Sequence, residues 1–299
     1  HNHSKDDLKT IVLRLDHNLF RPEAQRGASV PAEATDGMVL TSLKVAGQVA
    51  DLKVAPTMGR PGGAGNATAA KVSISGLTQT IATINLTEPI KAGTTAELDI
   101  EWHTKLPGGP NGRGHRMTQR FDSKLFQPTQ WYPRLAKYDD LRGWETSPYL
   151  GPSEFYNNFG KFDVRITVPG GWIVSGTGLL QNPNEVLTAT ARQRLSTVLN
   201  SDEEVTIVGE KEKGPGQATA LGDKLTWHFM ADKVNDFAWA TADSFMWKAT
   251  RATIPGKGPV PIHLFYLPER AKFFERAGKI SRHALEFYSK LWAPYPFPQ

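Results

Sequence analysis

Short runs of residues that favour β-strands recur along most of the chain, separated by glycine, proline and asparagine. Several runs alternate apolar with polar residues, as strands covered on one face do. Glycine supplies positive φ and proline ends a hydrogen-bonded ladder, so segments such as "VPGG" and "PGKGP" predict turns. The runs follow one another with few intervening helices, which favours an antiparallel sheet or sandwich over βαβ units. The predicted strands are "KTIVLRLDHNLF", "MVLTSLKVAG", "AKVSISGL", "TIATINLTE", "TAELDIEWHTKL", "KFDVRITVPGGWIVSGTG", "KLTWHFMADKV" and "VPIHLFYL".

Two stretches have helical periodicity instead. The segment "VLTATARQRLSTVLN" has apolar residues at helical spacing and Thr188 or Thr190 as its N-cap, which predicts a short helix. A second helix is predicted from about Pro268 to Trp292, and Pro294 ends it. Its apolar stripe consists of Phe273, Phe274, Ala277, Ile280, Ala284, Phe287, Tyr288 and Leu291.

These patterns predict a mainly β fold with two parts. Residues 1–250 form a large antiparallel β-sheet or sandwich domain, and residues 251–299 form a truncated α+β segment that ends in the one amphipathic helix. A single amphipathic helix cannot bury its own apolar stripe. Its partners therefore lie either on the β domain or in residues outside this chain.

Composition narrows the classes of protein. Hydrophobic residues make up 39% of the chain and charged residues 22%, so we expect a packed core rather than disorder. No apolar run approaches the roughly 18 to 20 residues of a membrane helix. The formal net charge of +5 is spread along the chain without a nucleic-acid-binding motif, so no nucleic-acid partner is predicted. The absence of cysteine excludes disulfides, thiolate metal sites and cysteine nucleophiles.

The residues of this chain predict no catalytic group and no metal site. A zinc-peptidase helix needs His-Glu-x-x-His, and the most similar segment, "HALEF" from His283, has Ala284 and Phe287 at the required Glu and His positions. His283 is therefore expected to be an exposed helix residue. Asp139 and Asp140 are adjacent, a poor spacing for a glycosidase pair, and we expect them to form or cap a turn. No Gly-x-Ser-x-Gly elbow and no phosphate-binding loop occur.

Aromatic residues are concentrated between Phe126 and Phe162. The positions are Phe126, Trp131, Tyr132, Tyr138, Trp144, Tyr149, Phe155, Tyr156, Phe159 and Phe162. Alternation cannot bury all of them on one sheet face. They either pack against a neighbouring layer or line a cleft for a peptide or a sugar.

The same region resembles the bacterial branch of the aminopeptidase N family of zinc metallopeptidases. That family has a Trp-Tyr/Phe-Pro element before an Asp, followed by a strand pair like "FDVRITVPGGWIVSGTG". Three further segments resemble the family in the same order along the chain: the opening strand of its β domain, a strand near the end of that domain, and the first helix and Tyr-Pro turn of its catalytic domain. These segments are "DDLKTIVLRLDHNLF", "VNDFAWATADSF" and "HALEFYSKLWAPYPFPQ".

The resemblance implies that the chain is the N-terminal β domain of such an enzyme, without its first strands, plus the start of a thermolysin-like catalytic domain. The family's zinc motif follows the Tyr-Pro turn and would lie beyond Gln299. The complete protein would bind Zn²⁺ through two His and a Glu, with a second Glu as general base. For this chain alone we predict no cofactor and no hydrolytic activity.

The resemblance also points to two candidate substrate-binding residues. In relatives, the β domain lends a Gln or Glu from an inner loop to hold the free amine of the substrate. A carbonyl oxygen suits this role because an ammonium group has three donors and no acceptor. The corresponding loop here is "FQPTQWYP", so Gln127 or Gln130 is the candidate. The expected partners are a peptide substrate and the remainder of the catalytic domain. Relatives are often exported, which favours a periplasmic or secreted location.

Two alternatives stay open from the sequence. The chain could be a stand-alone β-sandwich module that binds a peptide or a carbohydrate through its aromatic loop. It could also be part of a non-catalytic scaffold relative of the same family.

Overall fold

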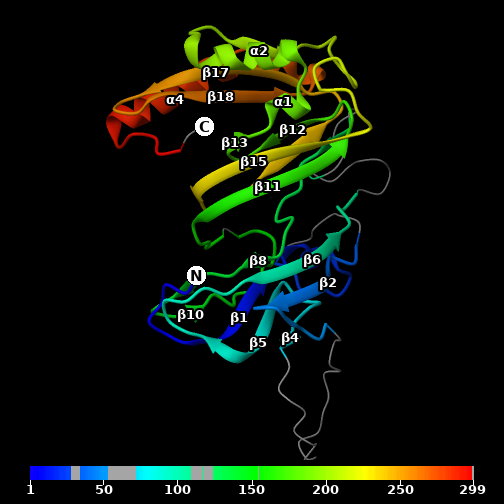
Figure 1. Ribbon diagram of the computed structural model, residues 1–299, viewed down its shortest axis with the longest axis vertical. Helices are drawn as coiled ribbons and strands as arrows, with labels where there is room; N and C mark the ends of the chain where they lie inside the picture. Colours follow the sequence, from blue (N-terminus) through cyan, green and yellow to red (C-terminus); the bar gives the residue numbers. More distant parts are fainter. Residues whose placement is uncertain (28–33, 53–71, 109–116, 118–123, 154, 298–299) are drawn as a thin grey trace, which may run out of the picture. The chain divides into compact units, whose positions relative to one another are not determined.

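The computed structural model describes residues 1–27, 34–52, 72–108, 117, 124–153 and 155–297. The chain forms two compact units (Figure 1). Unit 1 comprises His1–His115 and Thr129–Asn158, and unit 2 comprises Arg116–Pro128 and Phe159–Gln299. Both units consist mainly of antiparallel sheets, most of the short helices lie in unit 2, and the last helix is at the C-terminus, so the predicted fold class is confirmed.

Where the structure describes unit 1, it forms two main sheets and a two-stranded ribbon. The four-stranded sheet has the order β4 (Ser73–Ser75), β5 (Ile81–Ile90), β1 (Leu8–Arg14) and β8 (Arg134–Leu135). The three-stranded sheet has the order β3 (Gln48–Val49), β2 (Met38–Val45) and β6 (Leu98–Thr104). The ribbon pairs β9 (Tyr138–Asp139) with β10 (Gly143–Trp144). A 3-10 helix, η1 (Asp16–Phe20), follows β1.

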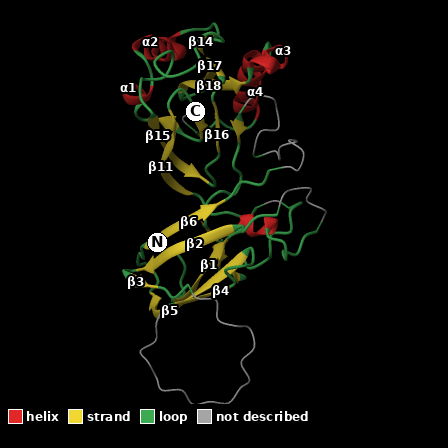
Figure 2. Cartoon of the chain, turned by 90° about the vertical axis from the view of Figure 1, so that its right-hand side faces the viewer, coloured by secondary structure: helices red, strands yellow, loops and turns green. Residues whose placement is uncertain are grey.

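The two main sheets of unit 1 share one hydrophobic core. Leu13 of β1 and Ile84 of β5 belong to the same buried cluster as Met38 and Leu43 of β2, with Ile100 of β6 packed against it. Figure 2 shows the strands of both sheets around this region. The unit is therefore a small sandwich, in which each sheet has one face turned to the core.

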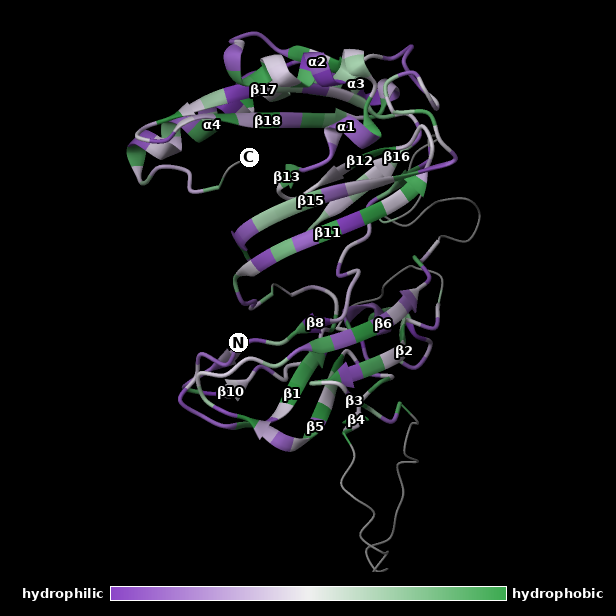
Figure 3. Cartoon of the chain, in the orientation of Figure 1, coloured by the Kyte–Doolittle hydropathy of each residue, from purple (hydrophilic) through white to green (hydrophobic). Residues whose placement is uncertain are grey.

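The described residues of unit 2 form three sheets of three strands. Their orders are β11 (Gly160–Pro169), β15 (Lys224–Val234), β13 (Leu179–Leu180); β12 (Ile173–Gly176), β16 (Trp239–Ala242), β7 (Leu125–Phe126); and β14 (Val205–Val208), β17 (Met246–Ile254), β18 (Gly258–Tyr266). Figure 3 shows hydrophilic and hydrophobic residues alternating along β11 and β15, as the period of two predicts.

The predicted helix after residue 186 is present as α2 (Ala189–Thr197), preceded by the short α1 (Pro183–Val186) and followed by η3 (Val198–Asn200). Thr188 is its N-cap, because the Thr188 side chain accepts a hydrogen bond from the backbone N–H of Ala191. The sequence alone predicts either this residue or Thr190 as the N-cap.

The predicted C-terminal helix is interrupted. It consists of η4 (Pro268–Arg270), α3 (Ala271–Phe274) and α4 (Ala277–Leu291). The ring of Phe274 stacks on Tyr266, 4.8 Å between centroids, which holds the first turns beside the end of β18. Helix α4 instead lies along β17 and β18 (Figure 1). No helix in the described ranges is long and apolar enough to span a membrane.

The predicted domain boundary at residue 250 lies inside β17, and both halves of this strand belong to unit 2. The chain passes between the two compact units at His115/Arg116, Pro128/Thr129 and Asn158/Phe159. The boundary between a β domain and the start of a second domain stays a prediction.

Candidate functional site

Gln127 and Gln130, the two predicted substrate-binding residues, lie on different compact units. Gln127 follows β7 in unit 2 and is exposed, and its backbone N–H donates to Met117 O at 2.9 Å. Gln130 belongs to unit 1 and is half-buried. Neither side-chain amide hydrogen-bonds to any residue within the described ranges.

Gln130 has an uncommon backbone conformation. Its φ is +47°, in the left-handed region that residues with a Cβ atom rarely adopt. Elsewhere among the described non-glycine residues, only Ala46 and Lys233 have positive φ. Ala46 lies between β2 and β3, in the tight turn where such a conformation is ordinary. At Gln130 the left-handed conformation costs on the order of 1 to 2 kcal/mol, so neighbouring contacts must hold it.

Two side chains hold the backbone on either side of Gln130. The carbonyl oxygen of Thr129 lies 2.6 Å from His17 Nε2, and the carbonyl oxygen of Trp131 accepts a hydrogen bond from Trp102 Nε1 at 3.1 Å. A carbonyl oxygen can only accept, so the Nε2 atom of His17 carries a hydrogen. The residues before and after Gln130 are thus both fixed by hydrogen bonds from distant segments.

His17 is itself firmly placed. Its side chain belongs to η1 and is among the largest fully buried side chains of the chain. Its Nδ1 atom lies 2.9 Å from the Thr104 hydroxyl oxygen, which also lies 2.9 Å from Gly37 O. The adjacent Asn18 donates to two backbone carbonyls, and its Oδ1 accepts from the backbone N–H of Met38 at 2.8 Å.

The sequence did not predict this arrangement. The run "KTIVLRLDHNLF" predicts a single strand, but β1 ends at Arg14 and residues Asp16–Phe20 form η1. All five residues of η1 are buried. Its three polar side chains obtain their partners from segments far away in the sequence, which a local strand pattern cannot reveal. The three adjacent polar residues, Asp-His-Asn, were the one signal against a continuous strand.

A buried cluster of charges anchors the chain just after the Gln130 loop. Asp16 lies between Arg14 (Nε to Oδ1, 3.4 Å) and Arg134 (Nη2 to Oδ2, 2.8 Å), and all three are almost fully buried. The guanidinium of Arg134 also lies 4.6 Å from the centroid of the Phe155 ring. Burial raises the pKa of Asp16, while the charges of the two guanidinium groups oppose this rise. This cluster joins the end of β1 to β8, and β8 begins at Arg134, four residues after Gln130.

Most of the concentrated aromatic residues make contacts within their own unit. Tyr138 packs edge-on against Trp144, whose Nε1 donates to Thr10 O at 3.1 Å, and Tyr149 lies 5.1 Å from Phe155. By contrast, Tyr156 and Phe159 are 51% and 68% exposed. These contacts favour the packing interpretation and give less support to an aromatic-lined cleft.

Other candidates from the sequence behave as expected. The Asp139 carboxylate accepts hydrogen bonds from the backbone N–H groups of Leu141 and Arg142, which lowers the pKa of Asp139 and closes the β9–β10 turn. His283 is exposed on α4 and stacks on Phe287, 5.8 Å between centroids. Across the described part of the chain, no three His, Asp or Glu side chains are grouped so that they could hold a metal ion.

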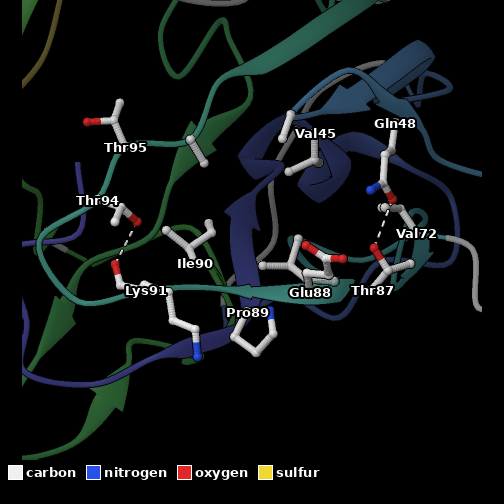
Figure 4. A pocket seen from close by; sticks show the side chains of 13 residues that line it. Val45, Gln48, Val72, Thr87, Glu88, Pro89, Ile90, Lys91, Thr94 and Thr95 are labelled. Atoms are coloured by element: carbon white, nitrogen blue, oxygen red, sulfur yellow. Dashed lines mark hydrogen bonds between the residues drawn. The ribbon is translucent and has the colours of Figure 1, made fainter.

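A surface pocket of about 200 Å³ lies elsewhere in unit 1, between the β2–β3 turn and the end of β5 (Figure 4). Its floor is apolar, with Val45, Val72 and Ile90, and the Thr87 hydroxyl donates to Gln48 Oε1 at 2.8 Å on one side. Neither predicted glutamine lines it.

No protein-family model and no curated protein matches this sequence. The fold of this chain is similar to solved structures of M1 zinc metallopeptidases. The match covers 99% of this chain and 48% of the length of each of those proteins. One is a mutant of a two-domain M1 zinc metallopeptidase bound to L-tryptophan (14% identity, TM-score 0.48). Another is a mutant of a two-domain M1 zinc metallopeptidase bound to L-arginine (13% identity, TM-score 0.45). A third, from Deinococcus radiodurans, is bound to a Tyr-Ser-Ala substrate (14%, 0.45). At this identity and with TM-scores under 0.5, the overlap does not assign the chain to that family.

Proposed function

We propose that this chain is the non-catalytic N-terminal part of a zinc-dependent metallopeptidase of the aminopeptidase type. In this role it shapes the substrate cleft, and Gln130 binds the free amino group at the N-terminus of a peptide. The proposal rests on the ordered resemblance of four sequence segments to the aminopeptidase N family, which include the loop "FQPTQWYP".

The left-handed backbone of Gln130 is the observation that carries the proposal. A strained residue that neighbouring groups hold in place is typical of binding and catalytic sites. The strain falls on one of the two residues that the resemblance selects, and the side-chain amide of Gln130 makes no hydrogen bond within the described ranges. Its carbonyl oxygen is therefore available to accept a hydrogen bond from an ammonium group.

The outer face of α4 supports a second part of the proposal, that the remainder of a catalytic domain packs on this helix. Five large apolar side chains occur there at helical spacing and are exposed: Ile280 (58%), Phe287 (49%), Tyr288 (49%), Leu291 (54%) and Trp292 (77%). Tyr288 and Trp292 stack on each other, 4.9 Å between centroids. A contiguous apolar face of this kind marks a surface that another part of a protein covers.

Zinc belongs to the complete protein in this proposal and not to the chain described here. The expected motif, His-Glu-x-x-His, would be encoded after the codon for Gln299. Sequencing the coding DNA beyond that codon is the first test. A degenerate motif there would favour the non-catalytic scaffold, and a stop codon would favour the stand-alone binding module.

The role of Gln130 is tested with the complete protein and a fluorogenic aminoacyl amide. We expect Gln130→Ala to lower kcat/KM about 10- to 100-fold, because a hydrogen bond to a charged group contributes about 1.5 to 3 kcal/mol. The N-acetylated substrate lacks the ammonium group, so its slower turnover is expected to change little in the variant.

Gln127→Ala is the matched comparison. If Gln127→Ala loses activity while Gln130→Ala does not, then Gln127 and not Gln130 is the residue that binds the amino group. If the zinc-loaded complete protein cleaves no aminoacyl amide at all, the metallopeptidase function is wrong.

A further inference from the structure

We propose that His17 and Trp102 are positioning residues that hold Gln130 in its left-handed conformation for amine binding. The inference deepens the proposed function and rests on the role of Gln130 in it. Neither His17 nor Trp102 was singled out by the sequence, and their assignment comes from the contacts around the loop.

The two positioning residues act on both sides of one strained residue. His17 Nε2 donates to Thr129 O at 2.6 Å, and Trp102 Nε1 donates to Trp131 O at 3.1 Å. A left-handed residue relaxes toward an extended or helical conformation when its flanking peptide groups can rotate. Hydrogen bonds at both flanks oppose that rotation, so the two donors act together on the Gln130 backbone.

Both donors come from rigid parts of unit 1. His17 is 1% exposed, and its Nδ1 atom lies 2.9 Å from the Thr104 hydroxyl oxygen. Trp102 belongs to β6, packs against the hydrophobic core, and its ring lies 6.3 Å from the Trp131 ring. A donor that is already fixed loses little conformational entropy when it holds the loop.

This arrangement fixes the position of the backbone from which the Gln130 side chain extends. Binding residues function best when buried neighbours lock their geometry, because a misplacement of about 1 Å is enough to weaken a polar contact. Loss of either donor should therefore weaken amine binding without removing the amide that makes the contact. This outcome separates a positioning residue from a residue that touches the substrate.

The functional test uses the complete protein with His17→Phe and Trp102→Phe, which keep an aromatic ring and remove the donor. We expect each variant to raise KM about 3- to 10-fold for the aminoacyl amide, with a much smaller change in kcat and little change for the N-acetylated substrate. His17→Gln, whose amide still offers an N–H donor, is expected to restore part of the lost affinity. A loss of kcat alone, or an equal loss for both substrates, would overturn the inference.

Trp144→Phe is the matched control. Trp144 also belongs to unit 1, and its Nε1 also donates to a backbone carbonyl, that of Thr10, at 3.1 Å. Its loss removes the same chemical contact at a site that is not part of the Gln130 loop. We expect a comparable fall in the denaturation midpoint and an unchanged KM. If Trp144→Phe raises KM as much as Trp102→Phe, the effect is one of general stability and the positioning role is wrong.

A structural measurement on the present chain separates this inference from the proposed function. The three-bond coupling between the amide and α protons of Gln130 reports its φ, and we expect it to change in His17→Phe and Trp102→Phe but not in Trp144→Phe. An unchanged coupling in both loop variants would show that neither residue holds the conformation, whatever the activity. A changed coupling in a protein without peptidase activity would refute the proposed function and leave the positioning contacts intact.

Discussion

His263 is a partly buried titratable residue in the sheet of unit 2. Its ring lies against the rings of Trp247 and Phe265, and its Nδ1 atom accepts a hydrogen bond from Trp247 Nε1 at 3.1 Å. Burial lowers the pKa of His263 from 6.5 to about 4. The folded protein therefore keeps a neutral imidazole over a range of pH in which the unfolded chain is protonated.

This residue predicts a loss of stability in mild acid. Between pH 6.5 and about 4 the unfolded state binds a proton at His263 that the folded state does not, so acid favours unfolding. The contribution of His263 is complete above pH 6.5, and its loss by pH 4 amounts to on the order of 2 to 3 kcal/mol. We expect His263→Gln, which keeps an acceptor for Trp247, to lose correspondingly less stability over this range.

Urea denaturation at a series of pH values, followed for both proteins, measures this difference. Carboxylates such as Asp202 and Glu212, whose hydrogen bonds to arginine lower their pKa, contribute equally to both curves. Parallel curves for the two proteins would show that His263 does not titrate in the way its burial predicts.

At the scale of a single element, α4 has two apolar faces with different surroundings. Ala277 and Leu285 pack against the core formed by β17 and β18, and the buried Gly278 lies against the carboxylate of Glu204. Arg282 fixes the helix further by donating from Nε to Arg251 O at 2.6 Å. The opposite face exposes the larger side chains, so size does not decide which face of this helix is buried.

Two leucines on α4 test this distinction with the same chemical change. Leu285→Ala removes a side chain from the inner face and should lower the free energy of unfolding by about 2 kcal/mol. Leu291→Ala, on a side chain that is 54% exposed, should cost less than about 0.5 kcal/mol in this chain. Chemical denaturation of both variants measures the two values.

The same pair also tests what covers the outer face. In a longer protein whose added residues pack on α4, the cost of Leu291→Ala should rise to about that of Leu285→Ala, because the side chain becomes buried there. A cost that stays low in the longer protein would show that the outer face of α4 stays exposed.

At the scale of the whole molecule, the chain divides into two units with separate cores. The cluster of Arg14, Asp16 and Arg134 lies entirely within unit 1 and joins residues 118 positions apart. Removing the charge of a buried, paired carboxylate is costly because the guanidinium groups stay buried. The change should therefore affect unit 1 first.

We expect Asp16→Asn to destabilise unit 1 by about 3 kcal/mol, and so to lower the midpoint of its thermal unfolding by roughly 10 °C. Differential scanning calorimetry should show this shift in one transition, with the transition of unit 2 unchanged. Asp99→Asn removes the exposed ion pair with Lys44 (3.2 Å) in the same unit and should cost less than about 1 kcal/mol. Equal effects of the two variants would contradict a special role of the buried cluster.

The sequence by itself determined the elements whose signal is local. The period of two predicted the strands β11, β15 and β18, and the period of 3.6 predicted α2 and the C-terminal helical segment. Strand β17 was not predicted, because its residues lie where the sequence suggests a domain boundary. The interpretation of Asp139 as a turn residue also followed from adjacent residues. These features depend on contacts within a few positions of the chain or within one hairpin.

The tertiary structure alone decided the features that depend on distant partners. It replaced the end of the first predicted strand with η1, because His17 finds its partner Thr129 112 residues away. It buried the face of α4 where Ala277 and Leu285 pack on the core of β17 and β18, and left the larger apolar side chains exposed. It also gave Gln130, one of two glutamines that the sequence could not separate, a left-handed backbone. Contacts between segments far apart in the chain leave no periodic trace in it, so local patterns could not predict them.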